Sequence, residues 1–188
     1  FGDLLVLYNL NFEVEEGEFL CIVGPTGCGK TTFLNSLTRL YEPTAGEILV
    51  NGIPVDPKKQ NISYIFQEYS SFPWLTVEQN IRFGLEIKKT PKAEADANVE
   101  EMLDIVGLTK FRNYYPSQLS ISMLQRVAIA RAFATKPELL LMDEPYGQLD
   151  IDLRFKLEDE LIKLWKKTGT TVLFITHNIE EAVYLSQK

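Results

Sequence analysis

The sequence has little of what a metal-binding, disulfide-linked or membrane-spanning protein needs. It contains two cysteines, Cys21 and Cys28, and a single histidine. The two cysteines fit neither a zinc-ligand spacing nor a disulfide framework, so we expect a protein kept in the reducing cytoplasm. Apolar runs such as 139–142 and 172–175 are far too short to cross a bilayer, and we expect no transmembrane helix.

Positive charge is in deficit as well. Lys and Arg number 19 against 26 Asp and Glu, and the formal net charge of −7 argues against a protein that grips nucleic acid by bulk electrostatics. Hydrophobic residues make up 45% of the chain and charged residues 24%, which is typical of a soluble globular protein. With 188 residues, the chain is long enough for one domain, or one domain plus a subdomain, with a buried core.

A glycine-rich segment is the most informative feature that is present. It satisfies G-x-x-x-x-G-K-[ST], the pattern of a phosphate-binding P-loop, between a strand-like stretch at 19–23 and a helical pattern that begins near Lys30. Glycines let backbone N–H groups curl around phosphate oxygens, and the positive end of the following helix points at the same place. Lys30 supplies a charge for the β- and γ-phosphates, and the Thr31 hydroxyl suits Mg²⁺. The predicted ATP-binding residues here are Gly24, Pro25, Thr26, Gly27, Cys28, Gly29, Lys30, Thr31 and Thr32.

The apolar periodicity predicts the main elements. Strands are expected at 12–14, 19–23, 47–50, 62–66, 139–142 and 171–175. Helices are expected at 30–40, 76–89, 92–106, 123–135, 152–168 and from about 178 onward. Thr76 and Gln79 form the pattern of a capping box, and Gly107 is a helix stop. Strands and helices alternate at both ends around a mostly helical middle, which predicts an α/β core with a helical insertion.

Two carboxylates follow a strand that is apolar throughout. Asp143 and Glu144 come directly after 139–142, at the carboxyl end of the strand, where open α/β sheets bind their ligands. Alone, such a pair is usually a solvated loop, but the P-loop upstream reverses that expectation. Asp143 can hold Mg²⁺ through its water shell, and Glu144 can polarise the attacking water as general base.

Further motifs follow in a recognisable order. Gln67 comes directly after the strand predicted at 62–66, the segment 146–150 reads Tyr-Gly-Gln-Leu-Asp, and His177 comes shortly after 171–175. Together with the P-loop and the Asp-Glu pair, these motifs resemble those of the ATP-binding subunit of an ABC transporter, and the resemblance runs through the whole chain.

The resemblance implies a role for each of these residues. Gln67 would bind and sense Mg²⁺ and water, His177 would contact the γ-phosphate, and Phe1 would stack on the adenine. A lone histidine after a strand is by itself more often structural, and its place in the order of motifs is what favours the catalytic role. Hydrolysis would be an in-line attack by water, with Lys30 and Mg²⁺ neutralising the developing charge.

Three longer segments narrow the resemblance. The stretches 72–80, 115–120 and 180–185 are similar to those of the nitrate/sulfonate/taurine-type importer ATPases. This implies a subunit held at the inner face of the cell membrane by permease subunits, which powers uptake of a small solute delivered by a solute-binding protein. A groove near 67–76, with exposed aromatic residues such as Trp74, would receive the permease, although an aromatic cluster is by default core.

One segment departs from the family pattern. Where the family reads Leu-Ser-Gly-Gly, this chain reads Leu119-Ser120-Ile121-Ser122. In the family this segment opens a helix that contacts the γ-phosphate held by the opposite subunit, which here would be the task of Ser120 in trans. Ile121 is β-branched and costly wherever a positive φ is needed, whereas the Ser122 hydroxyl could itself meet a phosphate. We expect a weakened contact, unless the neighbouring chain accommodates Ile121; Gln148 is a second departure at the expected dimer contact.

Taken together, the motifs predict a P-loop NTPase of the α/β class in a single ABC ATPase domain, residues 1–188. The core, with a mainly parallel sheet, is expected at 1–69 and 138–188, with an antiparallel β subdomain near the N-terminus and a helical subdomain inserted at 70–137. The family continues past the histidine region, so the C-terminal end is expected to be truncated.

Two copies, in a homodimer or a heterodimer, would enclose two ATP molecules head to tail. Two alternatives stay open: a soluble ABC ATPase acting on DNA or ribosomes, and a regulatory partner that binds ATP but hydrolyses it poorly.

Overall fold

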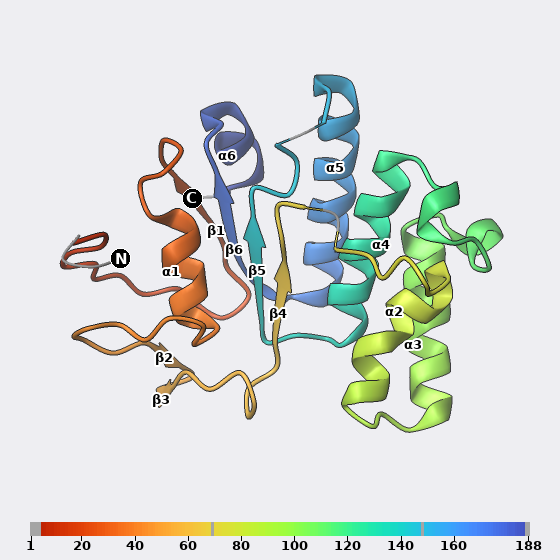
Figure 1. Ribbon diagram of the computed structural model, residues 1–188, viewed down its shortest axis with the longest axis horizontal. Helices are drawn as coiled ribbons and strands as arrows, with labels where there is room; N and C mark the ends of the chain where they lie inside the picture. The colour runs from red at the N-terminus through yellow and green to blue at the C-terminus, as the bar shows by residue number, and fades with distance from the viewer. Residues whose placement is uncertain (1–4, 69, 148, 187–188) are drawn as a thin grey trace.

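Four parallel strands form the central sheet, in the order β1-β6-β5-β4 (Figure 1). The computed structural model of the chain describes residues 5–68, 70–147 and 149–186. The strands are β1 (Phe19–Val23), β4 (Ile62–Ile65), β5 (Leu139–Asp143) and β6 (Thr171–Thr176). Because all the pairings are parallel, the carboxyl ends of the four strands lie at one edge of the sheet.

Helices cover both faces of this sheet, and β5 shows why. All five of its residues are buried, as the apolar run predicted. Leu139 and Leu141 join a core with α1 (Lys30–Leu37), while Leu140 and Met142 join the core on the opposite face. That opposite core contains apolar residues of α4 (Ile121–Ala134), α5 (Ile151–Thr168) and α6 (Ile179–Leu185). Because successive side chains of β5 point to opposite faces and all are apolar or buried, both faces of the sheet are covered, which gives three layers.

The middle of the chain is helical, as expected. α2 (Val77–Ile87), α3 (Lys92–Ile105) and α4 pack against one another, with the short turns η1 (Thr109–Phe111) and η2 (Pro116–Gln118) before α4. The capping box is confirmed: the Thr76 hydroxyl accepts from Gln79 N at 3.3 Å, and the Gln79 side chain accepts from Thr76 N at 2.9 Å. Gly107 follows α3 with a φ of 67°, which suits a helix stop. The chain positions at which core and helical subdomain divide stay a prediction.

The N-terminal region differs from the expectation. An antiparallel pair is present, β2 (Leu49–Val50) with β3 (Ile53–Pro54), but the strand predicted at 12–14 is wrong, because residues 5–15 have no regular secondary structure. A strand needs a ladder partner, and β2 pairs with β3 instead. Phe12 is held by packing, with its ring 5.7 Å from that of Phe33 on α1, and stays half-exposed.

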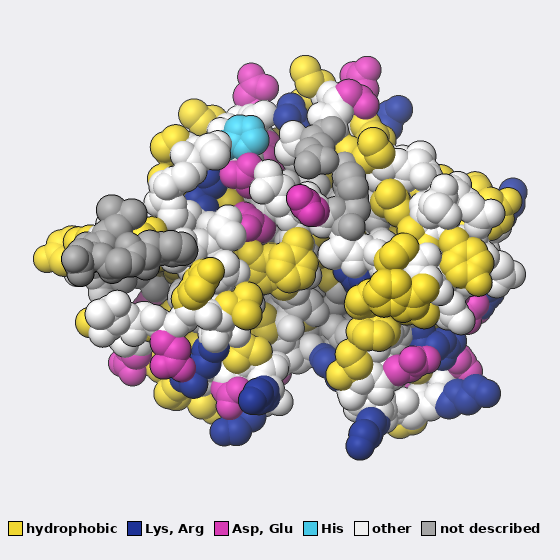
Figure 2. All heavy atoms as spheres, in the orientation of Figure 1, with side chains coloured by type: hydrophobic (Ala, Val, Ile, Leu, Met, Phe, Trp, Pro, Cys, Tyr) yellow, Lys and Arg dark blue, Asp and Glu magenta, His cyan; other side chains and the backbone are white. Residues whose placement is uncertain are grey.

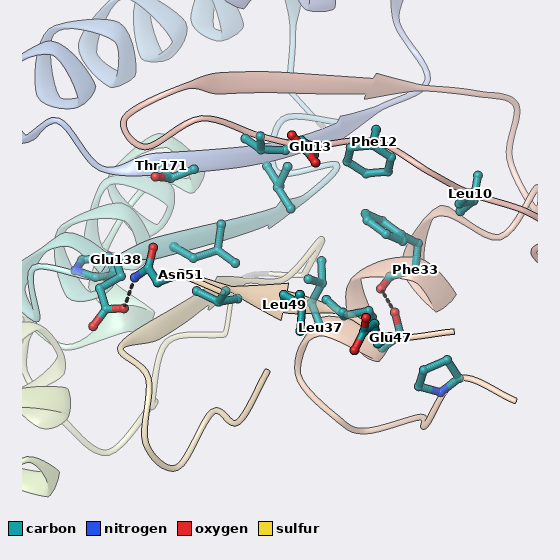
Figure 3. A pocket seen from close by; sticks show the side chains of 18 of the residues that line it. Leu10, Phe12, Glu13, Phe33, Leu37, Glu47, Leu49, Asn51, Glu138 and Thr171 are labelled. Atoms are coloured by element: carbon teal, nitrogen blue, oxygen red, sulfur yellow. Dashed lines mark hydrogen bonds between the residues drawn. The ribbon is translucent and has the colours of Figure 1, made fainter. Parts of the chain in front are cut away.

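Beneath α1, the irregular N-terminal segment and the β2–β3 pair line an open apolar groove (Figure 3). Leu10, Phe12, Leu37 and Leu49 are among its apolar residues, and Asn51 Nδ2 donates to Glu138 Oε2 at 3.2 Å across one end. The groove reaches Thr32 at the end of the P-loop, but none of the predicted catalytic side chains lines it. Among the helices described, none combines the length and the apolar character that crossing a membrane requires.

Candidate active site

Each of the four parallel strands is followed by a residue or motif predicted to act in ATP hydrolysis. β1 leads into the P-loop, and Gln67 lies two residues beyond β4. β5 ends at Asp143, with Glu144 next, and β6 is followed directly by His177. Parallel pairing therefore delivers groups from distant parts of the sequence to one edge of the sheet, the edge at which folds of this class bind ligands.

The P-loop has a backbone that only glycine adopts without strain. Gly27 and Gly29 have φ angles of 81° and 100°, and a Cβ on Gly29 would lie 2.9 Å from Val6 Cγ1. Gly29 is the N-cap of α1, whose first turn carries no acidic residue and receives no side-chain cap from the described residues. The first N–H groups of α1 are therefore available to an anion such as a phosphate.

Lys30 holds its ammonium group against the P-loop. Its side chain is 7% exposed, and Nζ donates to the carbonyl oxygens of Gly24 at 2.7 Å and Pro25 at 2.9 Å. Nζ also pairs with Glu144 Oε1 at 3.2 Å. These three oxygens match the three protons of the ammonium group. A phosphate reaching Lys30 would compete with the Glu144 carboxylate for this cation.

Glu144 is fixed between a cation and an imidazole. Its Oε2 lies 2.8 Å from His177 Nδ1, while Oε1 faces Lys30. Its φ of 45° is unusual for a residue with a side chain, and its N–H donates to Ile175 O at 2.9 Å. Backbone strain of this kind concentrates at functional sites. Figure 2 shows the imidazole at the surface beside acidic side chains. The geometry is that of a carboxylate held in place to accept a proton.

Asp143 has a partner that the sequence pattern did not reveal. Its carboxylate is 6% exposed, and the Tyr64 hydroxyl of β4 donates to Oδ2 at 3.2 Å. Burial, and then the Asp143 charge, raise the pKa of Tyr64 well above its usual value, so the hydroxyl stays a donor. No motif contains Tyr64; the signal that finds it is the β4–β5 register, which pairs Tyr64 with Leu141, two residues before Asp143.

The side chains at this edge fit Mg²⁺. This ion takes oxygen ligands, and it usually combines one or two protein groups with phosphates and water. Asp143 and the exposed Thr31, in the first turn of α1, supply such oxygens. Within the described ranges, no group of three or more His, Cys, Asp or Glu side chains could hold a metal by itself. An ion that depends on substrate phosphates for the rest of its ligands is consistent with that.

The remaining predicted residues make no hydrogen bond or ion pair with this cluster within the described residues, or lie outside them. Gln67 is exposed beyond β4, and Ser120 is exposed at the start of α4, where its Oγ accepts from Met123 N at 3.3 Å. Phe1 and Gln148 fall outside the described residues. An exposed Ser120 at the start of α4 is accessible to a second chain.

Ile121 shows no backbone strain. It is the first residue of α4 and is not among the residues with a positive φ, so the condition under which a β-branched residue would be costly is not met. α4 begins two residues earlier than predicted, because Ser120 caps it. The Ile121 side chain is 51% exposed at the helix N-terminus, and the Ser122 hydroxyl lies 3.0 Å from that of Ser120. The bulk of Ile121, and not its backbone, is therefore the reason to expect a weakened contact.

Comparison with known proteins identifies the family. The family model described as ABC transporter matches residues 7–147. The chain belongs to the ABC transporter family of ATP-binding proteins. A nitrate import ATP-binding protein of Synechocystis is 44% identical over the whole chain and 70% of the relative. A taurine import ATP-binding protein of Roseobacter denitrificans is 41% identical, over 97% of the chain and 68% of the relative.

A solved structure supports the same conclusion. It is a dimeric ATP-binding cassette in a post-hydrolysis state, bound to ADP and Pi, with 35% sequence identity and a TM-score of 0.81. The match covers 95% of this chain and 83% of that one. The expected P-loop ABC ATPase fold is therefore confirmed, and as a member of this family the chain binds ATP and hydrolyses it.

Proposed function

We propose that this ABC ATPase powers the uptake of a small oxyanion such as nitrate or a sulfonate like taurine through a membrane permease. The observation that carries the catalytic part is the Lys30–Glu144–His177 arrangement beside the P-loop. The relatives named for nitrate and taurine import support the transport class. The solute-binding protein of such a system would act on the permease and only indirectly on this chain.

The proposed mechanism assigns one task to each side chain. The phosphates of ATP bind at the N-terminus of α1, and Lys30 exchanges Glu144 for the β- and γ-phosphate oxygens. Glu144, released from the ion pair, accepts a proton from the attacking water, and His177 holds a γ-phosphate oxygen. Thr31, Asp143 and Gln67 would hold Mg²⁺, which supplies charge neutralisation to the phosphates.

A second copy, or a related subunit, would complete each site. Ser120 and the N-terminus of α4 are exposed, as a group that binds a partner's nucleotide must be. The dimeric relative supports this arrangement. Because Ile121 stands at this contact, the regulatory alternative, a subunit that binds ATP and hydrolyses it slowly beside a competent partner, remains the second candidate function.

The permease would dock on the aromatic segment before α2. Trp74 is 69% exposed, whereas Phe72 is anchored by Phe83, with ring centroids 4.4 Å apart, and by the Arg131 guanidinium 5.2 Å from its ring. Figure 2 shows hydrophobic side chains gathered over the helical part of the molecule. An anchored ring beside an exposed one suits a contact surface.

Transport in vesicles tests the proposed function. In vesicles that carry the proposed permease, ATP-driven uptake of labelled nitrate or taurine should require the chain and stop when Glu144 is replaced by Gln. The control is the Glu101→Gln protein, because Glu101, on α3, forms an exposed ion pair with Lys167 at 2.6 Å and belongs to none of the site motifs. Undiminished uptake without the chain, or binding to DNA or ribosomes instead of permease, would contradict the proposal.

Restoring the two family glycines tests the role of Ile121. Ile121→Gly with Ser122→Gly should raise dimer formation or ATPase rate at least about tenfold, equivalent to roughly 1.4 kcal/mol, while monomer affinity for ATP stays unchanged. Because the backbone at Ile121 is unstrained, Ile121→Ala should give much of the same gain. Light scattering counts dimers best with Glu144→Gln in every background. If neither variant forms more dimer or hydrolyses ATP faster than the original, the partner accommodates Ile121 and the hypothesis of a weakened site is wrong.

A further inference from the structure

Two glutamates lie in the core behind the active site and belong to none of its motifs. Glu158, on α5, is fully buried, and Glu181, on α6, is 5% exposed. Both helices contribute to the core on the same face of the sheet. Buried carboxyl groups of this kind are costly unless they are paired with charge or hydrogen-bonded.

Three carboxyl oxygens of the two glutamates lack a hydrogen-bond donor among the described residues. Both carboxyl oxygens of Glu158, and Oε1 of Glu181, are buried without an N–H or O–H partner among the described residues. The nearest cation, Arg154 Nε, is 3.6 Å from Glu158 Oε1, which is too far for a hydrogen bond. The two side chains are within hydrogen-bonding reach of each other. One proton between them would supply the donor, with the Glu158 O–H donating to the Glu181 carboxylate.

Glu181 in turn fixes the backbone on both sides of His177. Its Oε2 accepts a hydrogen bond from the Thr176 hydroxyl. The same hydroxyl accepts from Asn178 N at 2.9 Å, and the Asn178 side chain caps α6 by accepting from Glu181 N at 3.2 Å. The Thr176 carbonyl also accepts from Gly24 N at 3.4 Å, at the start of the P-loop.

We propose that Glu158 and Glu181 share one proton, and that this carboxyl pair is a positioning device for His177 in ATP hydrolysis. The proposal rests on the catalytic role proposed above for His177. With the proton in place, Glu181 is held by Glu158 and holds Thr176 and Asn178. With the proton lost, two buried carboxylates repel each other, and the corner that carries His177 loses its support.

The surroundings decide when the proton is lost. Burial, and then the charge of Glu181, raise the pKa of Glu158 to about 7, and burial raises the pKa of Glu181 as well. Burial also raises the pKa of Cys21 to about 12 and that of Tyr146 well above its usual value, so both stay protonated. The titratable and charged groups that face the pair are Cys21 on β1, Tyr146 after β5, Arg154 and Asp159 on α5, His177 after β6, and Tyr184 on α6.

The sign of the pH dependence follows from the raised pKa. The folded protein keeps a proton on Glu158 at pH values where an unfolded glutamate has lost it. The stabilisation is therefore complete below the ordinary glutamate pKa and falls away as the pH rises through about 7. Support for His177 should fall over the same range.

Glu158→Gln is the decisive variant, because its amide is a permanent donor to Glu181. Infrared spectroscopy of the purified protein at neutral pH should show the band of a buried protonated carboxyl group in the wild type and in Glu180→Gln, the exposed neighbour on α6. Glu158→Gln should lose this band. Between pH about 6.5 and 8.5, kcat of the wild type should fall at least about threefold relative to kcat of Glu158→Gln, with KM for ATP unchanged in both.

A second variant separates positioning from simple packing. Glu158→Leu fills the core but cannot donate, so it should lower kcat across the whole pH range without changing KM. If it does not fold, the pH profile of Glu158→Gln decides. An absent band, a band that persists in Glu158→Gln, or parallel pH profiles would overturn the inference. Loss of ATPase activity in His177→Ala is measured alongside: if that variant is fully active, the proposed catalytic site fails, whatever the carboxyl pair does.

Discussion

Glu144→Gln should slow ATP cleavage by about 10²- to 10⁴-fold, the range that a positioned general base contributes, while ATP still binds. The carboxylate is held between Lys30 Nζ at 3.2 Å and His177 Nδ1 at 2.8 Å, so it is already oriented for proton transfer. Gln has nearly the same shape and can occupy the same backbone conformation, but it cannot accept the proton. Single-turnover cleavage of ATP measures the step directly, free of product release.

The control for Glu144→Gln is a glutamate whose ion pair lies on the surface and outside the site motifs. Glu101→Gln breaks an ion pair with Lys167 on the surface and should leave the cleavage rate unchanged. Thermal unfolding of both variants shows whether either change disturbs the fold. If Glu144→Gln cleaves ATP as fast as the wild type in a single turnover, the proton acceptor is another group.

The ion pair between Lys30 and Glu144 suggests an order for phosphate binding and proton transfer in the proposed mechanism. Without phosphate at the P-loop, the cation and the base neutralise each other, and both are largely buried, with side chains 7% and 12% exposed. In the proposed mechanism, a phosphate that binds Lys30 would free Glu144 to act as the general base. The binding of ATP would then be coupled to readiness for cleavage.

Most of the site could be predicted from the sequence, because its residues directly follow strands. The P-loop, Asp143, Glu144 and His177 each come at the carboxyl end of an apolar stretch, and parallel pairing leaves them only one edge on which to meet. Spacing along the chain placed the P-loop and the Asp143–Glu144 pair at one edge, whereas the role of His177 was predicted from the family resemblance. Spacing was not enough to show that Lys30 and Glu144 form an ion pair, since that depends on side-chain conformations.

The features that the sequence did not reveal depend on contacts between distant segments. Tyr64 reaches Asp143 through the register of β4 against β5, and Glu158 meets Glu181 only because α5 and α6 share a face. The strand predicted at 12–14 failed for the same reason: local pattern cannot say whether a partner strand is present to complete a ladder. The backbone conformation of Ile121 likewise could not be predicted from the family pattern, because it follows from the Ser120 cap, which makes Ile121 the first residue of α4.

Calorimetric titration of Mg·ATP against the wild type and Lys30→Ala tests the central claim most directly, namely that the phosphates bind at the P-loop edge of the sheet. Two charge-assisted contacts to the β- and γ-phosphates, at roughly 1.5–3 kcal/mol each, should be lost, so affinity should fall at least about 100-fold. Glu144→Gln, which removes the competitor for Lys30, should bind ATP at least as tightly as the wild type. Equal affinities of the wild type and a correctly folded Lys30→Ala would contradict the account.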